Sequence, residues 1–240
     1  MDRVKSSYKN YENVANNTQC DTLMAGRYSV QKEDERRIVP DLFIKLNIKS
    51  SDNLLEIGCG TGNLLIPLSF SVDKVVGLDN NSAIQKLLNR TNASNLKGVA
   101  GNFLTYDINS LGKFKKILIY SVLHCLVDKE TVYSFIDRAL SLLEQDGVLL
   151  LGDIPNISLK NNFLKSNTGK KFSNQWQKRM EGDKVTKYFE SSFNSYIFDD
   201  KNIFNIMQHI KAKGYKVYLL PQPSDLPFGH TREDIVVSFF

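Results

Sequence analysis

The sequence has few cysteines and no long apolar run. Its three cysteines, Cys20, Cys59 and Cys125, lie far apart and lack the close spacing of zinc ligands, so the sequence supports neither a zinc site nor a disulfide framework. We expect reduced thiols. No apolar stretch approaches the ~20 residues that cross a bilayer, and residues 1–14 contain no hydrophobic core of a secretion signal. These absences predict a soluble, cytoplasmic protein with no membrane span.

The chain also lacks a broad excess of positive charge. Its net charge is +5, but residues 157–198 hold eight Lys and Arg against three Asp and Glu and so account for all of it. Binding to a phosphate backbone needs a wide cationic surface. We therefore expect no nucleic-acid partner, although a locally basic segment remains. The hydrophobic content of 42% is ordinary for a globular protein, and 240 residues suffice for one α/β domain.

The most informative stretch is LLEIGCGTGN, residues 54–63. Its apolar start predicts a buried strand, and its three glycines predict a tight turn whose backbone N–H groups approach a ligand at a helix N-terminus. The next apolar run, residues 74–79, predicts a second strand that ends at Asp79, where such folds bind ribose hydroxyls. Asn63 stands where the dinucleotide-binding fingerprint has its third glycine, which argues against NAD.

These residues resemble the first motif of class I S-adenosylmethionine-dependent methyltransferases, an acid followed by Gly-x-Gly-x-Gly after a strand. The resemblance extends over residues 50–155. It implies the Rossmann-like methyltransferase fold of the α/β class: a doubly wound, seven-stranded, mostly parallel sheet with helices on both faces and an antiparallel last strand. It implies S-adenosyl-L-methionine as the cofactor, held by Glu56, Gly58, Cys59, Gly60, Gly62, Asp79, Asn80, Asn102, Phe103 and Ser121. Asn102 replaces an acid that accepts from the adenine amino group, and its amide oxygen can still accept one hydrogen bond.

The order of patterns along the chain predicts a parallel sheet. Further strands are expected at residues 97–100, 115–121, 147–151, 216–220 and 235–240, and helices at residues 34–46, 83–90 and 129–143. Alternating strands and helices place helices on both faces of the sheet. Because ligands bind at the carboxyl ends of parallel strands, we expect the glycine turn, Asp79, Asn102, residues 121–124 and Asp153 to converge on one crevice.

We expect a single domain over residues 1–240, with two additions. Residues 1–48 are expected to form an N-terminal helical lid, because residues 11–15 are similar to the Tyr-rich helix that begins such enzymes; the alternative is a helix on the domain edge. Arg27 could face the cofactor's carboxylate or stay on the surface. Residues 156–198 form a substrate-side insert without strong periodicity, either a lid or a mobile loop.

Methyl transfer depends mainly on positioning, but an oxygen or nitrogen nucleophile must also lose a proton. His124, after the strand at 115–121, and His230, in the polar loop 227–234, are therefore the candidate catalytic bases. The alternatives are a structural histidine and a surface charge cluster. Asp153 is a candidate to bind a metal, to orient a substrate hydroxyl, or to cap a helix or turn. No acidic cluster indicates a metal site.

The leading interpretation is an enzyme that methylates a small-molecule acceptor, with a sugar or nucleotide-linked sugar hydroxyl as the candidate acceptor. An Asn/Asp-Pro-Pro-Tyr-type motif is missing, since residues 121–124 read SVLH, which argues against methylation of DNA or glutamine. Two alternatives stay open. One is a non-catalytic S-adenosylmethionine-binding regulatory protein, favoured by Asn102, and the other is an RNA or protein methyltransferase. The sequence leaves the oligomeric state unknown.

Overall fold

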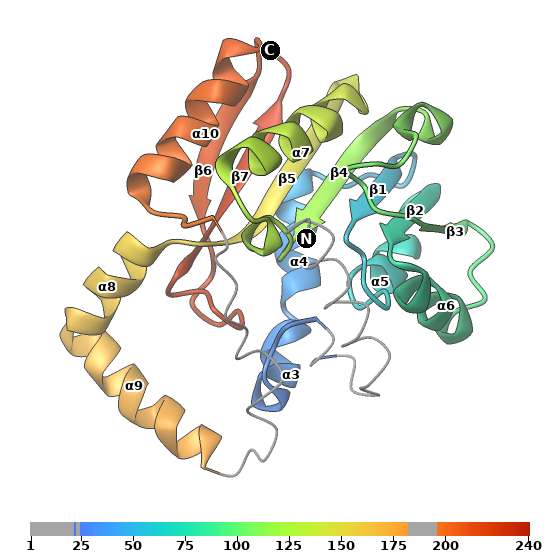
Figure 1. Ribbon diagram of the computed structural model, residues 1–240. Coiled ribbons are helices and arrows are strands. Elements are labelled where there is room, and N and C mark those ends of the chain that lie inside the picture. The colour runs from blue at the N-terminus through green and yellow to red at the C-terminus, as the bar shows by residue number, and fades with distance from the viewer. Residues whose placement is uncertain (1–21, 23–24, 182–195) are drawn as a thin grey trace.

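The computed structural model describes residues 22, 25–181 and 196–240 of the chain. Within these ranges a seven-stranded sheet has the order β3-β2-β1-β4-β5-β7-β6 (Figure 1). Strands β1 to β5 are parallel, whereas β7 pairs antiparallel with β5 and β6. This confirms the predicted sheet. The strands are β1 (Asn53–Ile57), β2 (Lys74–Asp79), β3 (Leu96–Ala100), β4 (Phe114–Tyr120), β5 (Leu143–Pro155), β6 (Lys216–Pro221) and β7 (Arg232–Ser238).

Helices cover both faces of the sheet, as the alternating pattern predicts. One face packs against α4 (Ile38–Leu46), α5 (Leu65–Ser69) and α6 (Asn81–Arg90). The other face packs against α7 (Lys129–Ser141) and α10 (Asp200–Ala212). Short helices are η1 (Ser29–Gln31), α3 (Lys32–Glu35), η2 (Ile108–Leu111) and η3 (Leu123–Cys125).

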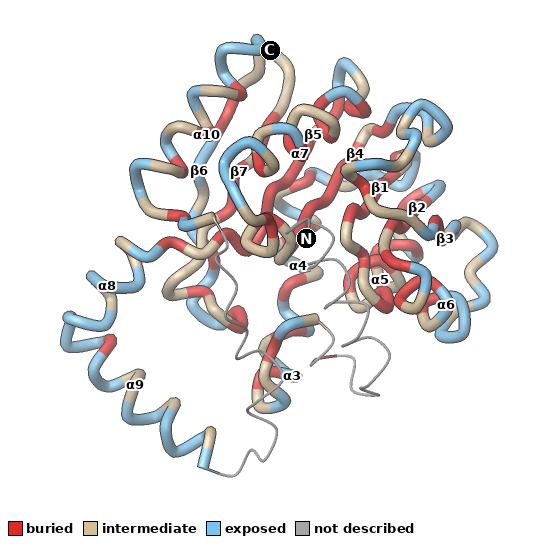
Figure 2. The backbone as a smooth tube through the Cα atoms, in the orientation of Figure 1, coloured by how far each residue is buried: buried red, intermediate tan, exposed pale blue. Residues whose placement is uncertain are grey.

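The strands are apolar on both sides because each side meets a layer of helices. In β4, Ile117 and Ile119 join the core under α7 and α10, whereas Leu118 joins the core under α4, α5 and α6. This alternation follows from the period of two residues in a strand. Figure 2 shows the central strands as buried and the outer turns of the helices as exposed. The sheet is thus a rigid platform whose strand ends carry the site.

Some element boundaries differ from the sequence prediction. The helix expected over residues 34–46 is divided into α3 and α4, because the Arg37 N–H donates to the Asp34 carbonyl at 3.2 Å in a tighter turn. The strand expected at residues 147–151 extends over the whole of β5, because β5 also pairs with β7 at its far end. There Pro155 lies opposite Arg232, so β7 begins earlier than predicted.

The insert after β5 is regular where the structure describes it. It forms a hairpin of two helices, α8 (Ile157–Lys165) and α9 (Asn167–Met180), which projects from the carboxyl end of β5 (Figure 1). Asn156 caps α8 by accepting from the Ser158 N–H at 2.9 Å, and Ser166 caps α9 by accepting from the Gly169 N–H at 3.0 Å. The segment for which the sequence left a lid or a mobile loop open is therefore helical over α8 and α9.

Part of the N-terminal prediction cannot be compared with the fold, since the Tyr-rich helix at residues 11–15 lies outside the described residues. Across the ranges that the structure covers, no helix is long and apolar enough to cross a membrane. In the same ranges, no group of three or more His, Cys, Asp and Glu side chains could hold a metal ion.

Candidate functional site

A cavity lies at the carboxyl ends of β1, β2 and β4, the edge at which open α/β sheets bind ligands. Its wall combines residues that are far apart in the sequence, as the predicted crevice requires. The predicted cofactor residues that line it are Glu56, Gly58, Cys59, Gly60, Asp79, Asn80, Asn102, Phe103 and Ser121. Gly62 and Asp153 are absent from the lining. Both residues lie behind the wall, where Gly62 packs against Leu87 and Asp153 accepts a hydrogen bond from Ser121.

The glycine turn after β1 has a backbone conformation that other residues rarely adopt. Gly58, Gly60 and Gly62 have φ angles of 80°, 53° and 88°. A Cβ on Gly58 would lie 2.4 Å from Val122 Cγ2, and one on Gly62 would lie 2.3 Å from Leu87 Cδ1. A Cβ on Gly60 would meet nothing within 4 Å. Packing therefore requires Gly58 and Gly62, whereas Gly60 leaves open space beside the cavity.

The carboxylate of Asp79, at the end of β2, lies directly beside this turn. Its Oδ2 accepts from the Gly60 N–H at 2.7 Å, and its Oδ1 accepts from the Asn80 N–H at 2.6 Å. Asn80 also caps α6 by accepting from the Ala83 N–H at 2.9 Å. Burial raises the pKa of Asp79, and these N–H donors oppose the rise. The turn and the carboxylate together form one wall of the cavity.

Glu56 is a buried acid with an unused oxygen. The residue is 2% exposed, and its Oε2 has no hydrogen-bond partner among the described residues. Burial raises the pKa of Glu56 well above its ordinary value; the charge of Asp79 adds to the rise, and the Arg27 guanidinium opposes it. Arg27 also lines the cavity, and its Nε is buried without a partner in the described chain. Buried polar atoms of this kind call for an explanation, and a polar ligand supplies one.

Asn102 follows β3 and lines the cavity beside Phe103. From the sequence, its amide oxygen is expected to accept a hydrogen bond from the adenine amino group. In the structure this oxygen accepts a hydrogen bond from the Leu104 N–H at 3.0 Å and closes the turn after β3. An amide oxygen has a second lone pair, but the turn fixes the direction of the side chain. An adenine contact would therefore share this oxygen with a structural hydrogen bond.

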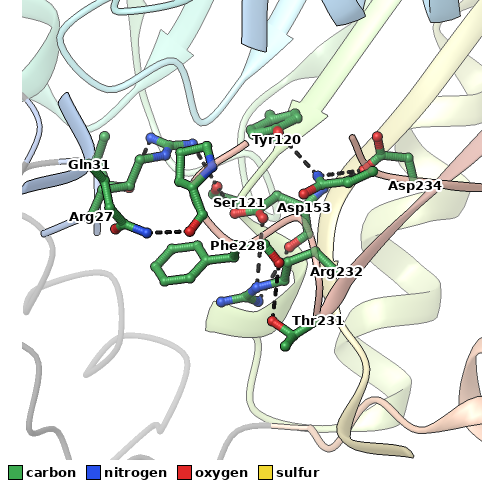
Figure 3. Close-up of polar contacts among 12 residues, drawn as sticks. Arg27, Gln31, Tyr120, Ser121, Asp153, Phe228, Thr231, Arg232 and Asp234 are labelled. Atoms are coloured by element: carbon green, nitrogen blue, oxygen red, sulfur yellow. Dashed lines mark hydrogen bonds and ion pairs between the residues drawn. The ribbon is translucent and has the colours of Figure 1, made fainter. Parts of the chain in front are cut away.

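A polar network lies on the other side of the cavity, at the ends of β4 and β5 (Figure 3). Arg27, only 4% exposed, donates to Glu35 Oε1 at 3.1 Å and to Ser121 Oγ at 3.2 Å. The Ser121 hydroxyl donates to Asp153 Oδ2, and Arg232 Nε lies 3.6 Å from Asp153 Oδ1. The network connects the segment before η1 to the strand ends, so Arg27 is a buried residue of the site and not a surface arginine.

Two members of this network, Ser121 and Asp153, have left-handed backbones with φ angles of 60° and 59°. Such a conformation costs a non-glycine residue about 1 to 3 kcal/mol and persists only where its surroundings impose it. The Asp153 N–H donates to Asp234 Oδ1 at 2.8 Å, and the buried Asp234 pairs with Lys45 Nζ at 2.7 Å. Asp153 therefore holds Ser121, which lines the cavity, from behind the wall.

His124, in η3, lines the cavity beside Ser121 and Cys125. Burial lowers the pKa of His124 to about 4, the nearby Arg232 and Arg27 guanidinium groups add to the lowering, and Asp153 opposes it. The ring is therefore neutral at neutral pH. It is able to accept a proton, but it is a weaker base than the neutral-pKa histidine that the sequence interpretation assumed.

His230 does not line the cavity. Its ring stacks on Phe163 of α8 with ring centroids 4.3 Å apart, and it contacts Phe172 of α9 at 5.0 Å. His230 thus packs the loop between β6 and β7 against the helical hairpin. Of the two candidate bases, the structure brings only His124 to the cavity wall, which corrects the expectation of a second histidine there.

Sequence reasoning missed Glu35, which orients two residues of the site. Glu35 Oε1 accepts from Arg27 and also accepts from Asn63 Nδ2 at 3.0 Å, so it joins the N-terminal segment to the glycine turn. The available signal was an acid eight residues after an arginine near a predicted helix start. That spacing does not distinguish a buried pair from a surface pair.

Several solved methyltransferases share this fold. The N-methyltransferase NodS from Bradyrhizobium japonicum WM9, in complex with S-adenosyl-L-homocysteine, has a TM-score of 0.61 and 16% identity over 96% of this chain and 97% of its own. Magnesium protoporphyrin IX methyltransferase (ChlM) from Synechocystis PCC 6803, with bound S-adenosylmethionine, has a TM-score of 0.62 and 12% identity over 100% of this chain and 98% of its own. Phosphoethanolamine N-methyltransferase 1 from Haemonchus contortus has a TM-score of 0.71 and 13% identity, and the match covers 98% of this chain but 48% of that one.

A family match defines the assignment further. A search of curated proteins gives no match, but a family model described as a methyltransferase domain matches residues 48–192. This range is more than half of the chain and includes the glycine turn, Asp79 and the strand ends around the cavity. The motif, the sheet and the family match agree. The chain belongs to the methyltransferase domain family.

Proposed function

We propose that this methyltransferase transfers a methyl group to a small-molecule acceptor bound in the cavity beside the cofactor. Its methyl donor is S-adenosylmethionine. The observation that carries the proposal is that one cavity joins the glycine turn and Asp79 to a second wall within residues 120–127. The first wall suits an adenosyl donor, and the second is available to the acceptor.

The residues of the first wall fit the donor. Asp79 accepts from the Gly60 N–H and from the backbone and side-chain N–H groups of Asn80, which leaves about one lone-pair site, on Oδ2, for a ribose hydroxyl. Gly60 leaves space for close approach. The unpartnered Glu56 Oε2 suits the donor's amino group, and the unpartnered Arg27 Nε suits its carboxylate. The remaining donor residues in the proposal are Gly58, Cys59, Gly62, Asn80, Asn102, Phe103 and Ser121.

When bound, S-adenosylmethionine supplies an electrophilic methyl group on a positively charged sulfur. The chain's own contribution is to hold the acceptor atom in line and to exclude water, which accounts for much of the rate of such a displacement. Val122, Leu126 and Phe135 make this part of the cavity largely apolar. A sugar or nucleotide-linked sugar hydroxyl is the first acceptor candidate, with His124 accepting its proton.

A nitrogen acceptor is the second candidate, and the low pKa of His124 favours it. General-base catalysis is most efficient when the pKa of the base is near the working pH. A ring with a pKa of about 4 gives little help to an unactivated hydroxyl. A neutral amine attacks through its own lone pair and needs no proton removed beforehand. The NodS neighbour is an N-methyltransferase.

The acceptor class is tested by incubating the purified chain and S-adenosylmethionine with separate pools of sugars, nucleotide-linked sugars and small amines, and measuring S-adenosylhomocysteine. We expect release with at least one of these pools. Release with RNA or protein only would contradict the small-molecule proposal. Cofactor binding without release from any pool would instead support a regulatory protein.

Replacing His124 by Asn separates the two acceptor candidates. With a hydroxyl acceptor, loss of the proton acceptor should lower kcat about 10²- to 10⁴-fold, and with an amine acceptor less than about tenfold. In the native enzyme His124 gains a proton only as the pH falls toward about 4. The kcat profile should therefore show no histidine limb between roughly pH 5 and 8. His230→Asn is the matched control and should keep kcat; an equal loss in both variants would refute the role of His124.

Replacing Glu56 by Gln should have opposite effects on the free and bound protein. The folded state binds the Glu56 proton more tightly than the unfolded chain, so this group lowers the free energy of unfolding as the pH rises above the ordinary glutamate range. Gln carries no charge, so the variant does not lose this part of its free energy of unfolding. Its Tm without cofactor at neutral pH should therefore rise. Cofactor affinity should fall by about tenfold, because a charged hydrogen bond becomes a neutral one. Thermal unfolding with and without cofactor measures both the stability and the affinity. Glu33→Gln, on the surface, should change neither the Tm nor the affinity. A lower Tm without cofactor for Glu56→Gln would count against the assignment of Glu56.

We also propose that residues 1–240 form one domain with an N-terminal lid at residues 1–48 and a substrate-side insert at residues 156–198. Contacts between the described parts support this arrangement. Arg179 of α9 donates to the Val30 carbonyl at 2.7 Å, and Trp176 packs edge-on against Tyr28 with centroids 5.5 Å apart. The insert thus packs on the segment that follows Arg27 in the chain.

A further inference from the structure

The hairpin of α8 and α9 carries the positive charge of the chain. Residues 157–180 contain six Lys and Arg and no Asp or Glu, whereas the net charge of the whole chain is +5, so the rest of the chain sums to −1. We propose that this hairpin is a docking surface for an anionic lipid bilayer. Docking of this kind determines where the enzyme works and is separate from the methyl transfer itself.

The lysines of the hairpin are exposed and have no partner. They are Lys160, Lys165, Lys170, Lys171 and Lys178, and their side-chain ammonium groups have no hydrogen bond or ion pair to the described residues. Some cations elsewhere on the surface form ion pairs, such as Arg36 with Glu33 and Arg37 with Asp225. Unpaired charges of one sign create a local field that attracts a partner of the opposite sign.

The aromatic side chains of α9 fix the direction of its lysines. Phe172 and Trp176, one turn apart, face ring systems of the body: Phe172 contacts His230 at 5.0 Å and Trp176 contacts Tyr28 at 5.5 Å. Lys171 and Lys178 are seven residues apart and so share a face. That face is turned away from the aromatic side by the helical spacing of 3.6 residues per turn. These two lysines therefore point away from the body of the molecule.

Exposed apolar side chains lie among the lysines of α8. Ile157 and Leu164 are 42% and 41% exposed, and Lys160 lies between them at helical spacing. A face that mixes lysine with exposed aliphatic side chains is typical of helices that lie in a membrane interface. In Figure 2 much of the hairpin is coloured as exposed, and it projects beyond the sheet from the edge that carries the cavity.

The side chains of the hairpin favour a bilayer over RNA. Single-stranded RNA is bound by exposed rings that stack on bases, but the rings of α8 and α9 are packed against the body. Phosphate groups are bound most specifically by the planar fork of arginine. Arg179, the arginine of the hairpin, is occupied by Asp34 at 3.3 Å and by the Val30 carbonyl. Lysines and aliphatic side chains instead suit a diffuse anionic headgroup layer.

Sedimentation with vesicles tests the proposal on the full chain. We expect binding to vesicles of phosphatidylcholine and phosphatidylglycerol that weakens with added salt, and little binding to phosphatidylcholine alone. Each surface lysine contributes about a fivefold factor, equivalent to ~1 kcal/mol. The triple variant Lys170→Gln, Lys171→Gln, Lys178→Gln should therefore bind on the order of 100-fold more weakly. It should keep its Tm and its S-adenosylhomocysteine release with a water-soluble acceptor, since these lysines lie outside the cavity.

A matched control removes the same charge elsewhere. Lys97, Lys201 and Lys211 are also exposed and unpaired within the described chain, and their triple Gln variant should bind vesicles nearly as the native chain does. An equal loss in both triples, or no vesicle binding by the native chain at low salt, would overturn the proposal. Salt-sensitive binding of an RNA homopolymer without vesicle binding would overturn it in favour of the nucleic-acid alternative. Vesicle binding and methyl transfer are measured independently. Either proposal can therefore be refuted while the other stands.

Discussion

Gly60→Ala should remove most of the affinity for S-adenosylmethionine while the chain still folds. The backbone of Gly60 has a φ angle of 53°, and a Cβ there would enter open space at the cavity wall without touching other protein atoms. Overfilling a fitted site costs about 1 to 3 kcal/mol, or roughly tenfold to hundredfold in Kd. Titration calorimetry measures the loss of affinity.

Gly112→Ala is the matched control for this variant. Gly112 has a φ angle of 82° and also has nothing within 4 Å of a built Cβ, but it lies outside the cavity. Both variants should lose about 1 to 3 kcal/mol of folding stability, because L-residues are strained at positive φ, and Gly112, with a ψ angle of −157°, lies in a region that is essentially restricted to glycine. Only Gly60→Ala should lose cofactor affinity. Unchanged affinity in Gly60→Ala would mean that the cofactor does not approach the turn.

Asp79→Ala should weaken cofactor binding through two effects. It removes the acceptor proposed for a ribose hydroxyl, and a hydrogen bond to a charged group contributes about 1.5 to 3 kcal/mol. It also leaves the Gly60 N–H, which donates to Asp79 at 2.7 Å, without its partner. We expect at least a tenfold to hundredfold rise in Kd, as about 1.4 kcal/mol corresponds to a factor of ten.

The ionisation of Asp79 gives this prediction a second readout. Burial raises the pKa of Asp79, so the carboxylate gains a proton at a higher pH than an ordinary aspartate. Native cofactor affinity should therefore fall as the pH is lowered through that raised pKa, and Asp79→Ala should lack this part of the pH dependence. Asp225→Ala, which breaks an exposed pair with Arg37, should bind cofactor normally. Equal affinities for Asp79→Ala and the native chain would reject the ribose assignment.

The sheet and the cofactor side of the cavity were predictable because their signals are local. The apolar runs of β1, β2 and β4 can be read directly, since strands buried on both faces are almost uniformly apolar. Three glycines at that spacing after a strand have few roles other than a tight turn that approaches a ligand. Because parallel strands end on the same edge, placing these motifs at strand ends also predicted that they meet.

The acceptor side was less predictable because it depends on distant contacts. Nothing in the sequence marks Ser121 and Asp153 as left-handed residues, and their conformation is imposed by Arg27, Asp234 and Lys45 from other elements. His230 resembled His124 as a base from sequence alone. Only the packing of α8 shows that the His230 ring stacks on Phe163.

The hairpin of α8 and α9 shows a further limit of periodicity. Its polar composition hides the helices, since the large apolar side chains that α9 turns toward the body are Phe172 and Trp176, and its exposed positions carry Lys, Asn and Gln. The caps at Asn156 and Ser166 were the readable signals, because both residue types are preferred N-caps. Such a helix is stable only where its aromatic side meets a partner.

The most direct test of the cofactor site is a crystal structure of the chain with S-adenosylhomocysteine. We expect the adenosyl group between the glycine turn and Asp79, with a ribose hydroxyl on Asp79 Oδ2 and the amino group near Glu56 Oε2. A ligand bound elsewhere, or no ligand between Gly60 and Asp79 at a concentration well above its Kd, would contradict it.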